Sequence, residues 1–96
     1  MKIVYLPHLL IRLKEREIPQ NYPQLILQEP EKLYFDTITR RFIAVKKLNY
    51  LTKIKNIVVV YDIIEETNKI ITIYPISESE LKNKLKSGRW LRYEKN

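Results

Sequence analysis

Two apolar runs separated by a polar loop dominate the pattern of hydrophobic positions, and they predict a β-hairpin at the centre of the fold. The first run covers residues 57–64 and the second covers residues 70–76, with Glu, Thr, Asn and Lys between them. Both runs are rich in β-branched residues, which favour strands. The first is apolar at nearly every position, which is typical of a strand covered on both faces.

The register of this hairpin depends on where its turn lies. If Thr67 and Asn68 form a two-residue turn, Tyr61 lies opposite Tyr74. In this register Asp62 lies on the apolar face of the hairpin, where it would need a hydrogen-bond partner. The apolar residues on the same face as Asp62 are Val58, Val60, Ile64, Ile71 and Ile73. The other face carries Tyr61, Ile63, Thr72 and Tyr74. A slip of one residue would exchange the two faces.

The apolar positions before the hairpin follow a helical period. Residues 2–6 are a short strand or an extended lead-in. Pro7 begins a helix that runs to about Arg16, because the first helical position does not need an N–H group. A second helix begins near Asn21 and ends before Pro30. The short connection between them predicts a helical hairpin.

The remaining segments predict two further strands and a C-terminal helix. The strands cover residues 33–36 and 41–47, and residues 48–56 form a polar loop. Residues 77–96 form a helix followed by a basic, aromatic tail. Ser77 and Glu80 have the spacing of a capping box at the start of this helix, and Gly88 has the position of its C-terminal stop.

Together these elements predict a single domain over residues 1–96. The expected fold class is α+β with two layers, in which the helical hairpin packs on a four-stranded antiparallel sheet and a further helix follows at the C-terminus. The chain has no run of about 20 apolar residues that would span a bilayer. Its first seven residues are too short and too soon interrupted for a signal peptide, so we expect a cytoplasmic protein without a membrane partner.

Composition narrows the chemistry that is available. The 96 residues include no cysteine, which excludes disulfides, zinc–thiolate sites and cysteine nucleophiles. Eighteen Lys and Arg against eleven Asp and Glu give a net charge of +7, which favours an anionic partner. Nucleic acid is the first expectation, with an acidic protein or an acidic membrane face as alternatives. One glycine and abundant Ile, Lys and Glu fit either a thermophile or an A+T-rich genome.

A motif at the start of the chain carries a family resemblance. His8, Arg12, Arg16 and Ile18 reproduce the pattern His-x-x-x-Arg-x-x-x-Arg-x-Ile, and residues 70–75 read Ile-Ile-Thr-Ile-Tyr-Pro. The chain thus resembles the small proteins called domain of unknown function four-two-five-eight, which look like relatives of the RelE/ParE and BrnT toxins. The resemblance covers roughly residues 6–75.

The chain departs from this family pattern at two positions. Leu9 stands where the family usually has Ala, and Glu17 stands where it usually has Gly at the end of the helix. The C-terminal helix and tail lie outside the resemblance. What the resemblance implies is a RelE/ParE-like fold, metal-independent RNA cleavage on free RNA or on the ribosome, and an acidic antitoxin as partner protein.

The opening helix supplies the candidate catalytic residues. His8 is the only histidine, and its ordinary pKa suits a general acid or base in RNA cleavage. Arg12 and Arg16 would stabilise the charge of the phosphorane that forms when the 2′-hydroxyl attacks the adjacent phosphate. The alternatives are structural: a helix-start histidine bonded to the backbone or a carboxylate, and arginines in salt bridges.

Cations and tyrosines on the predicted strands supply the candidate nucleic-acid contacts. By analogy with the RelE-like toxins, the strand cations would grip the scissile phosphate; the alternative is an edge strand guarded by charge. These cations are Arg40, Arg41, Lys46 and Lys47. Tyr61 and Tyr74 would stack on bases or form an ordinary cross-strand pair. No metal-ligand spacing, Gly-rich phosphate loop or Ser/His/Asp arrangement is present, so no cofactor is expected.

Three functional hypotheses follow from these observations. The first is a toxin-type, metal-independent endoribonuclease. The second is a non-enzymatic basic module that binds protein or nucleic acid through the same residues. The third is an inert structural or accessory domain.

Overall fold

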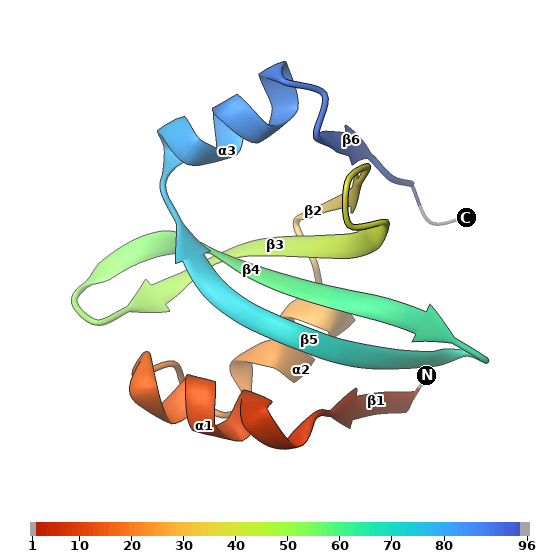
Figure 1. The fold of residues 1–96 in the computed structure, drawn as a ribbon. Helices are drawn as coiled ribbons and strands as arrows, with labels where there is room; N and C mark the ends of the chain where they lie inside the picture. The colour runs from red at the N-terminus through yellow and green to blue at the C-terminus, as the bar shows by residue number, and fades with distance from the viewer. Residues whose placement is uncertain (1, 95–96) are drawn as a thin grey trace.

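The fold is known from a computed structural model, which describes residues 2–94 of the chain. A mixed six-stranded sheet forms its centre, with the strand order β1-β5-β4-β3-β2-β6. Figure 1 shows α1 and α2 on one side of this sheet and α3 on the other. The elements are β1 (Lys2–Tyr5), α1 (Pro7–Glu15), α2 (Tyr22–Gln28), β2 (Lys32–Asp36), β3 (Arg41–Tyr50), β4 (Lys53–Ile64), β5 (Thr67–Ile76), α3 (Glu78–Lys86) and β6 (Trp90–Arg92).

The predicted fold class is wrong in both of its layers. The sheet has six strands rather than four, and β1 pairs with β5 in parallel, so the sheet is mixed rather than antiparallel. The two helices do not form a hairpin, because α1 packs mainly against β5 while α2 packs against β3 and β4. Strand β1 lies in residues 2–6, which the sequence left open between a short strand and an extended lead-in. Strand β6 was not predicted, because its three residues are too few for alternation to show in the sequence.

The central strand β4 is covered on both faces, as its continuous apolar run predicted. Ile57, Val58 and Val59 have no exposed surface, although successive side chains of a strand point to opposite faces. The core on the α1–α2 side contains Leu9, Leu13, Ile18, Ile26, Ala44, Ile57, Val59, Tyr61, Ile70 and Ile73. The core on the α3 side contains Tyr34, Ile43, Val45, Val58, Ile76 and Trp90.

The predicted register of the β4–β5 hairpin is wrong. Its turn is formed by Glu65 and Glu66, both with positive φ, and not by the two residues that follow them. An irregularity between Val60 and Tyr61 shifts the pairing again. As a result Tyr61 lies opposite Ile70 rather than opposite a tyrosine, and it packs in the α1–α2 core.

The predicted loop at residues 48–56 is also a hairpin. Strand β3 continues to Tyr50 and β4 begins at Lys53, with only Leu51 and Thr52 between them. Leu51 has a φ of 58°, the backbone conformation that a tight turn requires. Residues 51–55 at the tip of this strand pair are exposed, which explains why the composition of the segment is typical of a loop.

The C-terminal helix follows the prediction, but the tail does not. Ser77 accepts a hydrogen bond from the Glu80 amide and Glu80 reaches back to the Ser77 amide, which completes the capping box of α3. Gly88 has a φ of 75° beyond the end of the helix. The chain then enters β6, which pairs with β2. Among residues 2–94, no helix has the length and apolar character needed to cross a bilayer.

Two neighbouring valines test this assignment of faces. We expect Val59→Asp to prevent folding, because a carboxylate without a partner in the α1–α2 core costs several kcal/mol, a large part of a small domain's stability. Val60 is only half-buried, at the edge of the α3 core. Val60→Asp should therefore keep a cooperative unfolding transition in a urea titration. Equal loss of structure in the two variants would contradict the assignment.

Candidate nucleic-acid interface

Part of the sheet on the α3 side has no helix over it (Figure 1). Helix α3 follows the end of β5 and covers that end of the sheet, whereas the end that carries the tip of the β4–β5 hairpin is open (Figure 1). Strand pairing places a set of polar side chains on this surface, which we call the open sheet face. Its members are Arg41 from β3, Asp62 from β4, and Lys69, Thr72 and Tyr74 from β5, with Arg16 and Arg89 at its borders.

Charges of alternating sign cross the open sheet face in one row. Lys69 pairs with Asp62 across the β4–β5 ladder. The Asp62 carboxylate lies 3.7 Å from Nε of Arg41, so it has the polar partner that the sequence required. Arg41 in turn lies opposite Asp36 in the β2–β3 ladder. The side chains of Asp62 and Arg41 are about one-third and two-fifths exposed, so solvent weakens this ion pair.

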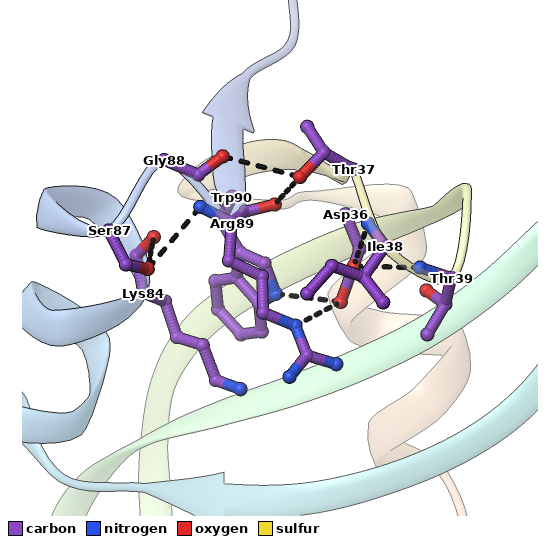
Figure 2. Close-up of polar contacts among 9 residues, drawn as sticks. All are labelled: Asp36, Thr37, Ile38, Thr39, Lys84, Ser87, Gly88, Arg89 and Trp90. Atoms are coloured by element: carbon purple, nitrogen blue, oxygen red, sulfur yellow. Dashed lines mark hydrogen bonds and ion pairs between the residues drawn. The ribbon is translucent and has the colours of Figure 1, made fainter.

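Asp36 is the most heavily bonded carboxylate in the site (Figure 2). Its Oδ1 accepts hydrogen bonds from the amides of Ile38 and Thr39, at 2.9 and 3.0 Å. Its Oδ2 accepts from Nε of Arg89 at 3.2 Å and from Nε1 of Trp90 at 3.1 Å. Burial alone would raise the pKa of Asp36, but these hydrogen bonds and the Arg89 charge outweigh it and hold the pKa below its ordinary value.

The same contacts fasten the segment after α3 to the β2–β3 turn. The Thr37 amide donates to the Arg89 carbonyl at 2.8 Å, and the Thr37 hydroxyl donates to the same carbonyl at 3.0 Å. Trp90 stacks on Tyr34 with 5.8 Å between ring centroids. Lys84 of α3 lies 5.8 Å above the Trp90 ring. The hydrogen bonds from Thr37 to the Arg89 carbonyl and the stacking of Trp90 on Tyr34 therefore fix the backbone that carries Arg89.

Arg16, predicted to be catalytic, joins helix α1 to the sheet. Its Nη1 donates to the Ile73 carbonyl and to the Thr72 hydroxyl. β1 covers only the first four residues of β5, so the later part of that edge is free of a strand partner and Arg16 satisfies one of its carbonyls. The hydroxyl of Tyr50 donates to the Arg16 carbonyl at 2.8 Å. Arg16 therefore makes structural contacts, but they are hydrogen bonds to a carbonyl and a hydroxyl of the sheet rather than the salt bridge of the structural alternative.

The structure does not bring the other two predicted catalytic residues to this edge. His8 and Arg12 are exposed on α1. No hydrogen bond or ion pair within residues 2–94 links either side chain to Arg16 or to the sheet cations. A helix rises about 1.5 Å per residue, so His8 lies roughly 12 Å from Arg16 along the axis of α1.

The four predicted strand cations are dispersed. Arg40 lies over the Phe35 ring at 5.8 Å. Lys46 donates to the Glu29 carbonyl at 2.7 Å, and Lys47 lies 3.8 Å from Glu78 of α3. Of these four cations only Arg41 is on the open sheet face.

The two predicted base-stacking tyrosines lie on opposite faces of the sheet. Tyr61 is buried beside Phe42, and burial raises the pKa of its hydroxyl to about 12. Tyr74 is half-buried on the α3 side. Burial raises the pKa of Tyr74 as well, while the positive charges of Arg89 and Arg16 oppose that shift. Tyr74 therefore lies within the influence of both arginines, and Tyr61 is an ordinary core residue.

Five residues of the site were absent from the sequence-based candidates: Asp36, Asp62, Lys69, Thr72 and Arg89. For Asp36 a signal existed, because an aspartate followed by a turn favours a side-chain bond to the backbone two residues on. The pairing of Lys69 with Asp62 required the correct hairpin register. Arg89 lies 53 positions from its carboxylate partner, a separation that no local pattern spans.

Comparisons with known proteins were made for both sequence and fold. No protein-family model, curated protein or solved structure matches this chain. Within residues 2–94, no group of three or more His, Asp or Glu side chains is placed to hold a metal ion.

Proposed function

We propose that this protein is a non-enzymatic module that binds single-stranded RNA through the open sheet face. The observation that carries this proposal is the placement of Arg41 and Lys69 on the part of the sheet that no helix covers, with Arg89 and Arg16 at its borders. One carboxylate there, on Asp36, is buried and fully bonded. In a chain with a net charge of +7, such a surface attracts a polyanion.

A single strand fits this surface better than a duplex does. The surface is a broad sheet face, and the bases of a single strand are available for contact with apolar and aromatic side chains. Tyr74 offers a half-buried ring, and the charges of Arg89 and Arg16 are near enough to act on the pKa of its hydroxyl. Ile64 and Val4 are 49% and 40% exposed on the same face. Phosphates would contact the cations while bases lie on these side chains.

Binding is favoured over cleavage because the candidate general acid or base is not near the cations. His8 is exposed on α1, and Arg16 is occupied by the edge of β5. Metal-independent RNA cleavage needs a proton-transfer group within hydrogen-bond reach of the reacting ribose or leaving oxygen. On the open sheet face the ionisable groups are arginines, a lysine, a tyrosine and two carboxylates that are paired with arginines.

We expect the wild-type protein to leave RNA intact in the presence of EDTA, both as free mRNA and on ribosomes. His8→Ala should bind RNA with the same affinity as the wild type, because His8 lies outside the open sheet face. The measurement is gel analysis of RNA integrity together with a binding titration of each variant. Cleavage by the wild type that falls roughly 10²–10⁴-fold in a folded His8→Ala variant would contradict the proposal and support the endoribonuclease hypothesis.

A further inference from the structure

We propose that Arg89 forms a preorganised subsite for one phosphate group of the RNA, and that Asp36 is the residue that positions it. This inference rests on the proposed function, since the phosphate is taken to come from RNA bound on the open sheet face. Neither residue belongs to the sequence-based candidates.

The carboxylate occupies only one donor of the Arg89 guanidinium. Nε donates to Oδ2 of Asp36, and within residues 2–94 the terminal nitrogens Nη1 and Nη2 have no hydrogen-bond partner. Figure 2 shows these two nitrogens pointing away from the β2–β3 turn. An arginine held in this way retains a two-pronged edge that matches two oxygens of a phosphate.

Asp36 is itself immobilised before any ligand arrives. Two backbone amides and the Trp90 indole hold the carboxylate independently of Arg89. The guanidinium is therefore restricted by a rigid partner, and less side-chain entropy is lost when a phosphate binds. Most surface arginines and lysines have no such restraint, so their contacts with phosphate are weaker for the same charge.

Space for the phosphate is present beside the guanidinium. A shallow hollow of about 400 Å³ is lined by Arg89 together with Glu80, Asn83, Lys84 and Ser87. Lys84 adds a second cation to this hollow. Glu80 is the one carboxylate there, and its side chain is turned back to the Ser77 amide in the capping box. The hollow is thus open to solvent and is lined by two cations, and the carboxylates nearest to them are already bonded: Glu80 in the capping box and Asp36 at Nε of Arg89.

The experiment compares Arg89 with a cation of equal charge whose side chain is not held by a carboxylate. Lys82 is exposed on α3, and its side chain makes no hydrogen bond or ion pair within residues 2–94. Affinity is measured at low salt with a fluorescent single-stranded RNA of about 12 nucleotides. We expect Arg89→Ala to bind roughly 10- to 100-fold more weakly than the wild type, and Lys82→Ala to bind within about threefold of it. Arg89→Lys should resemble Arg89→Ala, because an ammonium does not offer a fork to the phosphate while bonded to Asp36.

Asp36→Asn separates positioning from simple charge attraction. This change makes the protein more positive by one unit, so charge alone predicts equal or tighter RNA binding. Loss of positioning predicts weaker binding, by about tenfold, in the fraction that circular dichroism shows to be folded. Tighter binding by folded Asp36→Asn would overturn the role of Asp36.

Trp90 provides a readout that does not depend on affinity alone. It is the only tryptophan, and its indole N–H donates to the same carboxylate oxygen as Arg89. In an NMR titration with RNA, the single indole N–H signal should shift saturably in the wild type and in Lys82→Ala. In Arg89→Lys it should shift far less. An indole signal that does not respond while RNA is bound would overturn the subsite.

The outcomes distinguish this inference from the proposed function. If the wild type binds RNA, and a double variant Arg41→Gln/Lys69→Gln weakens binding while Arg89→Ala does not, the open sheet face stands and the Arg89 subsite is wrong. If the wild type binds no RNA at low salt, both the function and the subsite are wrong. Weakening by Arg89→Ala far beyond that by Lys82→Ala, with the indole response described above, supports both.

Discussion

Replacing Asp36 with Asn should lower the free energy of unfolding by about 3 kcal/mol or more. The carboxylate is 4% exposed and accepts four hydrogen bonds, two of them from Arg89 and Trp90 at Oδ2. An amide in its place directs N–H groups at one of these pairs of donors, which leaves buried donors without an acceptor. Urea unfolding followed by the fluorescence of Trp90 measures the effect.

Asp62→Asn is the matched control for this change. Asp62 is also a sheet carboxylate next to an arginine, but its contact with Arg41 is 3.7 Å long and open to solvent. We expect Asp62→Asn to cost less than about 1 kcal/mol. Similar losses of stability in the two variants would show that the Asp36 network is not what fastens the C-terminal segment to the sheet.

The pH dependence of stability should carry the signature of the same carboxylate. Because the pKa of Asp36 is lower in the folded protein than in the unfolded chain, its ionised form stabilises the fold. This contribution is complete above the unfolded pKa of about 3.9 and is lost as the pH falls through the lower folded pKa. The wild type should therefore lose stability below about pH 4 more steeply than Asp36→Asn does. Parallel curves between pH 5 and pH 2 would contradict this.

Removing three cations from the open sheet face should weaken RNA binding by roughly 100-fold at low salt. The variant is Arg41→Gln/Lys69→Gln/Arg89→Gln, in which each side chain stays long and polar but loses its charge. Arg41 on β3 and Lys69 on β5 lie on the open sheet face, and Arg89, just before β6, lies at its border. A fluorescence anisotropy titration with the labelled RNA measures the affinity, and circular dichroism checks that the variant is folded.

The matched control removes the same charge elsewhere. Lys14→Gln/Lys82→Gln/Lys86→Gln changes three exposed lysines on helices α1 and α3 and gives the same net charge as the first variant. If the open sheet face binds RNA, the control should lose only a few-fold in affinity, through weaker long-range attraction. Equal losses in the two triple variants would mean that net charge, and not this face, determines binding.

The sequence predicted the features that depend on neighbouring residues. The apolar run of β4 required a strand covered on both faces, and Ile57 to Val59 are fully buried. Ser77 and Glu80 are three residues apart, so their capping box was visible without the structure. Asp62, which the sequence placed on the core face with a need for a polar partner, is one-third exposed and lies 3.7 Å from Nε of Arg41, so its partner is a solvent-exposed ion pair rather than a buried hydrogen bond.

The features that were missed depend on unusual backbone conformations or on distant partners. Glu65 and Glu66 both adopt positive φ in the β4–β5 turn, a position where Asn and Gly are the usual residues. Sequence reasoning therefore moved the turn toward Asn68, which changed the register and hid the pairing of Lys69 with Asp62. Strand β6 was missed because it is defined by its pairing with β2, and for residues 2–6 the choice between a short strand and an extended lead-in depended on the pairing of β1 with β5.

The candidate site was predicted less well than the fold, and for a related reason. A helical spacing of four residues suggested that His8, Arg12 and Arg16 act together, yet Arg16 reaches the edge of β5 while the other two stay exposed. The pair that the structure singles out instead, Asp36 and Arg89, is assembled only when β6 pairs with β2.

The central claim is that RNA phosphates contact the cations of the open sheet face. The most direct test is the salt dependence of RNA affinity for the wild type and the two triple variants. Each phosphate contact with a single strand contributes about 0.7 to the slope of log K against log salt concentration. For Arg41→Gln/Lys69→Gln/Arg89→Gln we predict a slope whose magnitude is about 2 less than that of the wild type. For Lys14→Gln/Lys82→Gln/Lys86→Gln we predict the same slope as for the wild type. No RNA binding by the wild type at low salt, or the same slope in all three proteins, would contradict the account and point to an acidic protein as the partner.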